Sequence, residues 1–140
     1  MTSIEAYATT RTGTFPERLA AAVGLLLALA LLRLPFRHTV RAVRWARRAG
    51  RRPLAPERAE ALIAAVRHAG HLWPVRCACA ETSLGAVLAA ALLGRRLAWC
   101  LGARFAPPPT AYHAWAEVPG HGPVGEYTTG GWHHHAALVI

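Results

Sequence analysis

Three side-chain types that together can cleave an amide bond occur in the second half of the chain: a cysteine, a histidine and a glutamate. Cys79 stands at the start of an apolar stretch typical of a helix, where free backbone N–H groups stabilise a thiolate. His113 lies in the middle of AYHAWAEV, which has the pattern of a strand and could aim an imidazole that accepts and returns a proton. A carboxylate would hold that imidazole in the required tautomer. These residue types predict nucleophilic catalysis by a thiol.

The third member of this group must be a glutamate, because all 7 acidic residues are Glu. Glu117 shares the expected strand of His113 and would lie about 13 Å away, at roughly 3.3 Å per residue, which is too far for a hydrogen bond. Glu126 follows the turn PGHG, and an adjacent antiparallel strand would bring it to about 5 Å from His113. We therefore predict the triad Cys79, His113 and Glu126.

Length and composition limit the kind of protein that carries this group. The 140 residues suffice for one domain, and 54% hydrophobic with 16% charged residues excludes intrinsic disorder. All 16 basic residues are Arg, and the net charge of +9 indicates an acidic partner. The 3 cysteines are an odd number without a secretory disulfide pattern, so we expect a reducing, cytoplasmic location.

The first half of the chain reads as helices. We expect a mobile segment over 1–16 and an Ala/Leu-rich helix over 18–36. Its uncharged part is shorter than the about 20 residues that span a bilayer, which favours a buried or interfacial helix. The next segment predicts an amphipathic basic helix with one arginine face: Arg37, Arg41, Arg44 and Arg48. This face is either solvated or binds anionic lipid or an acidic peptide, and we expect no nucleic acid because stacking aromatics are few.

The second half changes character after two further helices. The pattern predicts helices over 56–70 and 79–93, and then short strands over 97–105, 111–118 and 123–128 joined by turns. This order gives an α+β fold, with 17–140 as one domain divided into a helical, Arg-rich part (17–72) and a catalytic part (73–140).

Other readings of the cysteines and histidines remain open. Cys77 is a rival nucleophile, whereas Cys100 has the setting of a buried small hydrophobe. Cys77, Cys79 and the run His133, His134 and His135 invite a zinc site, but the ligand spacing is wrong for one, so we expect no metal. We expect the histidine run to be either a solvated tail or a local feature of no catalytic importance.

A resemblance sharpens these expectations. Residues 73–127 resemble the leader peptidases of lasso-peptide biosynthesis, which belong to the transglutaminase-like cysteine protease superfamily. The resemblance rests on ordered motifs: Trp73-Pro74 before the cysteine, Cys79 followed by Glu81 and Ser83-Leu84, Trp99-Cys100-x-Gly, and His113-Ala114-Trp115. It implies N-terminal helices packed with a transglutaminase/papain-like core, made of a Cys-bearing helix and a small antiparallel sheet.

The resemblance also implies the roles of particular residues. Cys79 would be the nucleophile, His113 the general base and Glu126 the acidic member, although the family often has Asp there and the turn PGHGP carries an extra residue. Residues supporting the site or its oxyanion would be Trp73, Glu81, Ser83 and Trp115. For Trp73 and Ser83, simple packing is the alternative.

The implied activity is removal of the leader from a ribosomally made precursor peptide, without a cofactor. A separate ATP-dependent cyclase would then close the ring, and a small recognition protein would deliver the leader to this stand-alone form of the peptidase. Two alternatives remain: a small membrane-associated or peptide-binding protein without enzymatic activity, and an acyltransferase of the transglutaminase type. Peripheral contact with a membrane surface is compatible with each of these functions.

Overall fold

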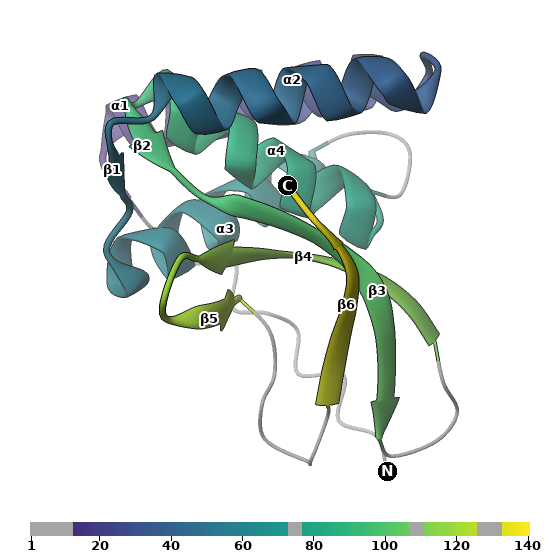
Figure 1. The fold of residues 1–140 in the computed structure, drawn as a ribbon. Helices are drawn as coiled ribbons and strands as arrows, with labels where there is room; N and C mark the ends of the chain where they lie inside the picture. The colour runs from purple at the N-terminus through teal and green to yellow at the C-terminus, as the bar shows by residue number, and fades with distance from the viewer. Residues whose placement is uncertain (1–12, 73–76, 107–110, 126–132) are drawn as a thin grey trace, which may run out of the picture.

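The fold is a layer of helices packed against one face of a curved antiparallel sheet, in a computed structural model that describes residues 13–72, 77–106, 111–125 and 133–140 (Figure 1). The helices are α1 (Phe15–Leu31), α2 (Phe36–Ala49), α3 (Pro56–His71) and α4 (Cys79–Leu92). The main strands are β3 (Ala98–Ala106), β4 (Ala111–Val118), β5 (Gly122–Val124) and β6 (His133–Val139). Two short strands, β1 (Arg52–Pro53) and β2 (Arg95–Arg96), form a separate parallel pair. The predicted α+β class is confirmed.

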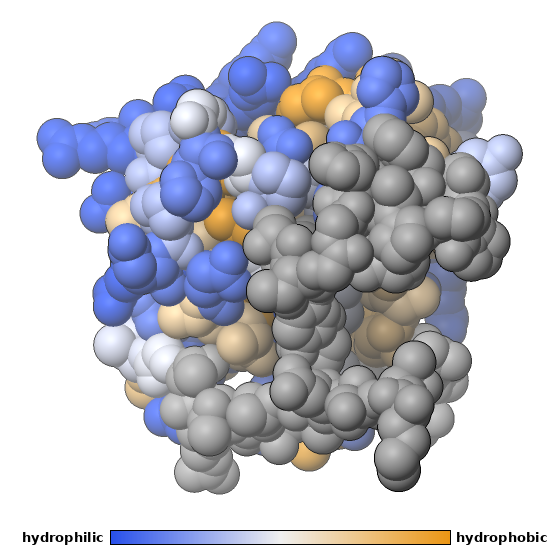
Figure 2. Space-filling model, turned by 90° about the horizontal axis from the view of Figure 1, so that it is seen from below, coloured by the Kyte–Doolittle hydropathy of each residue, from blue (hydrophilic) through white to orange (hydrophobic). Residues whose placement is uncertain are grey.

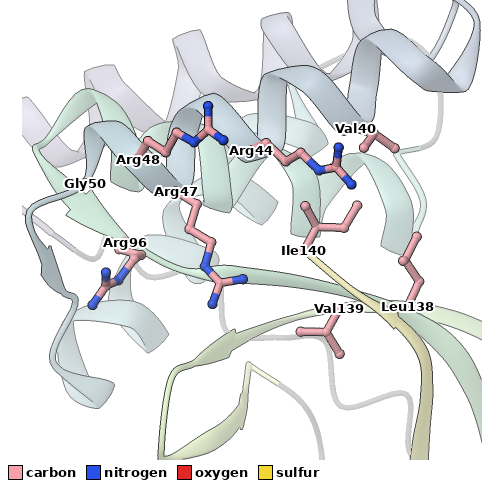
Figure 3. Close-up of a pocket in the computed structure, with 9 residues that line it drawn as sticks. All are labelled: Val40, Arg44, Arg47, Arg48, Gly50, Arg96, Leu138, Val139 and Ile140. Atoms are coloured by element: carbon pink, nitrogen blue, oxygen red, sulfur yellow. The ribbon is translucent and has the colours of Figure 1, made fainter.

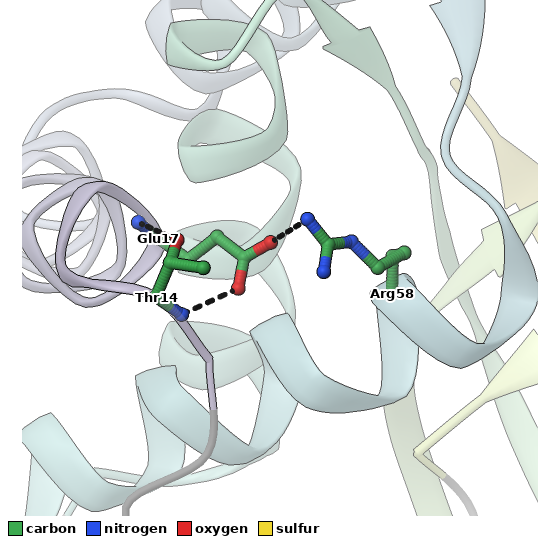
Figure 4. Close-up of polar contacts among 3 residues, drawn as sticks. All are labelled: Thr14, Glu17 and Arg58. Atoms are coloured by element: carbon green, nitrogen blue, oxygen red, sulfur yellow. Dashed lines mark hydrogen bonds and ion pairs between the residues drawn. The ribbon is translucent and has the colours of Figure 1, made fainter.

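A capping box fixes the start of α1. Glu17 Oε2 accepts a hydrogen bond of 2.9 Å from the Thr14 N–H, and Thr14 Oγ1 accepts one from the Glu17 N–H (Figure 4). Glu17 Oε1 also pairs with Arg58 of α3 at 2.7 Å. The helix thus begins at Phe15. The spacing Thr-x-x-Glu was the sequence signal for this start.

Helix α4 is the centre of the domain. Every residue from Ser83 to Ala91 is buried, and α1, α2 and α3 all pack against this helix. The backbones of α1 and α4 come very close, since a Cβ on Gly24 would lie 2.5 Å from the Gly85 carbonyl oxygen. The alanine- and glycine-rich composition of both helices permits this contact, and the Arg-rich helical part and the catalytic part therefore share one core.

The Ala/Leu-rich helix α1 is buried along one side only. Ala21, Leu25 and Ala28 lie in the core, whereas the opposite side exposes Leu19, Val23, Leu26 and Leu27. None of the described helices is both long and apolar enough to cross a membrane.

The sheet has the strand order β5-β4-β3-β6 with antiparallel pairing throughout. One face, with Trp99, Ala116 and Val118, joins the helical core, while Cys100, Trp115 and His113 belong to the other set of alternate positions. Strand β6 was not predicted. The histidine run, interpreted from the sequence as a solvated tail, forms the start of this strand and pairs with β3.

The surface seen from below, on the side away from α2, is mixed in character. Where residues are described, hydrophilic side chains predominate and hydrophobic ones form small separate areas (Figure 2).

Candidate active site

Cys79 is the first residue of α4, as predicted. The helix start is held by Glu81, whose Oε2 accepts a hydrogen bond of 3.0 Å from the Ala78 N–H. This bond satisfies a backbone donor just before the cysteine. Glu81 therefore supports the turn that carries the thiol.

The structure brings Cys79 together with His113. The imidazole hydrogen-bonds the sulfur and is the largest cause of a lowered pKa of the Cys79 thiol. Partial burial opposes this effect, whereas backbone N–H groups of Ala114 and Ala80 add to it. A thiolate in this setting has one cationic partner on β4 and helix N–H groups on its other side, which is the environment of a nucleophilic cysteine.

The other two cysteines have pKa shifts in the opposite direction. Burial and the charge of Glu81 raise the pKa of Cys77. Burial, together with the charge and hydrogen bonding of Glu117, raises the pKa of Cys100 to about 12. Cys79 alone of the three has a stabilised thiolate, so the rival reading of Cys77 as nucleophile loses support. Cys100 is fully buried, as its sequence setting predicted.

Aromatic rings surround His113 on the sheet. The Trp115 ring stacks on it, with centroids 6.0 Å apart and planes at 19°. The Trp115 indole Nε1 donates a hydrogen bond of 2.9 Å to Glu117 Oε1, which holds the indole in place. Glu117 thus contacts Trp115 and raises the pKa of Cys100.

His134 is a neighbour of this group that sequence reasoning missed. Its ring centroid lies 5.6 Å from that of His113 and 5.0 Å from that of Trp115. Between the two histidines runs β3, where Gly102 pairs with His113 on one side and Ala136 on the other and contributes no side chain. If the histidine run had been interpreted as a strand, the alternation of side chains between the two faces of a sheet would have placed one of the three histidines on the same face as His113.

Ser83 connects α4 to the sheet. Its Oγ accepts a hydrogen bond of 3.0 Å from Trp99 Nε1 and donates to the carbonyl oxygen of Cys79. Ser83 therefore does more than fill space, because it ties the backbone of Cys79 to β3.

The segment that leads to Glu126 is held by α3. The Gly125 N–H donates to Glu60 Oε1 at 2.9 Å, and the Gly125 carbonyl accepts from an Arg67 nitrogen at 2.7 Å. Gly125 has φ +71°, and a Cβ there would lie 2.7 Å from Ile63 Cγ2. Glu60 and Arg67 were not predicted, and long-range contacts of this kind leave no periodic signal in a sequence.

Two predicted residues, Glu126 and Trp73, lie outside the described residues, so their roles stay predictions. The predicted binding arginines of α2 are all exposed: Arg37, Arg41, Arg44 and Arg48. Within the described part of the chain, no group of three or more His, Cys or Glu side chains is arranged to hold a metal ion.

An α+β fold with a cysteine at a helix start, facing a histidine on an antiparallel strand, defines a thiol-dependent catalytic class. The family model of the transglutaminase-like superfamily matches residues 21–136. The chain belongs to the transglutaminase-like superfamily, whose members are typically cysteine-dependent enzymes. The match begins within α1, ends within β6 and so includes the helices as well as the sheet. No curated protein and no solved structure matches the chain significantly.

Proposed function

We propose that this protein is a cysteine peptidase that removes the leader from a ribosomally synthesised lasso precursor peptide. The observation that carries the peptidase chemistry is the hydrogen bond between Cys79 and His113, with the lowered pKa of the thiol. The ordered motifs around these residues support the choice of substrate.

The reaction follows from this pair. The Cys79 thiolate adds to the carbonyl carbon of the scissile amide, and backbone N–H groups at the start of α4 stabilise the negative oxygen. His113, as imidazolium, gives its proton to the nitrogen of the departing amine, and the C–N bond breaks to leave a thioester. His113 then takes a proton from water, whose oxygen attacks the thioester and regenerates the Cys79 thiolate. Glu126 is proposed to orient His113.

Partners follow from the same proposal. A recognition protein would bind the leader, and a separate cyclase would use the released core. The reaction needs no cofactor in the steps above, because thiolate, imidazole and water balance every bond and proton.

The test uses a leader–core precursor peptide with the recognition protein present, and mass spectrometry of the products. The wild-type chain and Cys77→Ser should release the leader, whereas Cys79→Ala should release none while keeping its circular dichroism spectrum. Cleavage by Cys79→Ala would overturn the assignment of the nucleophile.

Acyl transfer is distinguished in the same experiment. A primary amine is added to the reaction at millimolar concentration. If the protein is a hydrolase, the fragment released from the thioester ends in a free carboxylic acid. If it is an acyltransferase, that fragment ends in an amide of the added amine. A dominant amide product would overturn hydrolysis and retain the thioester chemistry.

A further inference from the structure

A cavity of about 760 Å³ lies outside the candidate active site, between α2, β2 and the end of β6 (Figure 3). Its polar lining is made of arginines from two elements: Arg44, Arg47 and Arg48 of α2 and Arg96 of β2. Its apolar lining comes from Val40 and the last residues of the described chain, 138–140. Cavities of about 300–1,000 Å³ are the size that holds specific ligands.

Among the described residues, no acidic side chain compensates the positive charge of this cavity. No glutamate lines it, and the ion pair found among the described residues, Arg58 with Glu17, lies elsewhere on α1 and α3. The Arg96 Nε is buried and has no hydrogen-bond partner among the described residues. Like charges gathered in a concave site repel one another, and an anion placed between them removes that cost.

The shape and the apolar lining narrow the choice of anion. A small inorganic anion would meet the guanidinium groups but leave Val40, Leu138 and Val139 uncovered. A lipid bilayer meets an outward helix face rather than a hollow between a helix and a strand. Figure 3 shows Arg47 extending from α2 down toward the sheet, between Arg96 and Val139, so a ligand there would contact cationic and apolar groups together.

Strand β6 adds a backbone feature beside the cavity. In the described sheet β6 is an edge strand that pairs with β3 alone. The N–H and C=O groups along the outer side of such a strand are available to an extended peptide. Leu138 and Val139 at this edge are exposed as well as lining the cavity.

We propose that this cavity binds a polypeptide segment in which acidic side chains alternate with apolar ones. The acidic groups would pair with Arg44, Arg47 and Arg96, and the apolar groups would cover Val40 and Leu138. The proposal concerns binding alone and holds whether or not Cys79 performs peptidase chemistry.

The test measures fluorescence anisotropy of a fluorescein-labelled peptide of alternating Glu and Leu, with the full-length chain carrying Cys79→Ala. A Gln-Leu peptide is the neutral probe. The groove variant is Arg44→Gln with Arg47→Gln, and the matched control is Arg37→Gln with Arg41→Gln. The control removes the same charge from the same helix at exposed positions that do not line the cavity.

We expect the groove variant to raise the Kd for the Glu-Leu peptide at least tenfold and the control to change it less than twofold. We also expect Kd to rise with salt and the Gln-Leu peptide to bind at least tenfold more weakly than its acidic counterpart. Circular dichroism of both variants checks the fold, and Arg96→Gln provides a second groove variant if the first one is perturbed.

Three outcomes would overturn the proposal. Equal losses in the groove and control variants would mean that the whole basic face of α2 attracts anions without a site. Displacement of the labelled peptide by inorganic phosphate at equal concentration would define a small-anion site. Preferential binding to phosphatidylglycerol vesicles, abolished by the same groove variant, would assign the arginines to lipid.

Discussion

The indole Nε1 of Trp99, on β3, donates a hydrogen bond of 3.0 Å to Ser83 Oγ on α4. Trp99 is 1% exposed and Ser83 is 7% exposed, so water cannot replace either partner easily. Because Ser83 also bonds the Cys79 carbonyl oxygen, this contact joins the sheet to the turn that carries the candidate nucleophile.

Ser83→Ala should destabilise the protein, because it leaves the buried Trp99 N–H without its acceptor. We expect a loss of about 1–3 kcal/mol in the free energy of unfolding, measured in urea. Trp99→Phe removes the donor, and the double variant should cost less than the sum of the single ones, since the two changes share one bond. Strict additivity would show that the bond contributes nothing.

The lowered pKa of Cys79 predicts alkylation that persists below the pH at which ordinary thiols stop reacting. Only the thiolate reacts with iodoacetamide, so the rate should fall as the pH drops through the lowered pKa. Removing the largest cause of the shift, in His113→Ala, should move the profile to higher pH, whereas the exposed His121→Ala should leave it in place. The rates are followed by mass spectrometry of the Cys79 peptide in a Cys77→Ser background. A profile unaffected by His113→Ala would contradict the thiolate–imidazole pair.

Gly125→Ala tests how α3 holds the segment before Glu126. The positive φ costs about 1–2 kcal/mol for a residue with a Cβ. The contact with Ile63 adds about 1–3 kcal/mol of overpacking. Gly94→Ala is the matched control, because Gly94 has φ +72° and nothing within 4 Å of the added Cβ. In thermal denaturation, the Tm of Gly125→Ala should be lower than that of Gly94→Ala. Only Gly125→Ala should lower kcat for the proposed peptide cleavage. Equal effects on both measurements would remove the positioning role of Gly125.

Glu17→Ala tests the cap of α1 and its link to α3, because alanine removes the acceptor of the Thr14 N–H as well as the charge. The capping contact is worth about 1 kcal/mol. The ion pair adds little, since the Arg58 side chain is 60% exposed. Glu57→Ala, in the first turn of α3 and exposed, serves as the control, and its effect should stay within about 0.5 kcal/mol. Urea denaturation measures the free energy of unfolding of both variants. Equal losses would show that the effect comes from removing a negative charge near a helix start and not from the capping contact.

The helices, the position of Cys79 at a helix start and the position of His113 on a strand could be predicted from the sequence, because each of them leaves a local pattern. The apolar periodicity of α3 and α4, the glycine after α4 and the alternation of β4 are features of neighbouring residues. Strand β6 was not predicted, because three histidines in a row show no alternation of apolar and polar residues. Its later residues Leu138 and Val139 are apolar, but they are too few to form such a pattern. The ties of Glu60 and Arg67 to Gly125 depend on tertiary packing between distant segments, which a single sequence does not reveal.

The burial of α4 on all sides has a consequence for motion. Amides of a helix enclosed in this way exchange with solvent only when the whole domain unfolds, so those of 83–91 should be among the slowest in hydrogen exchange. Cys79 lies one helical turn before this buried stretch, so the backbone that carries its sulfur is continuous with the part of the domain expected to open most slowly. In the proposed peptidase reaction, we therefore expect the movement that admits a peptide and releases its fragments to involve the segments around α4 rather than the helix itself.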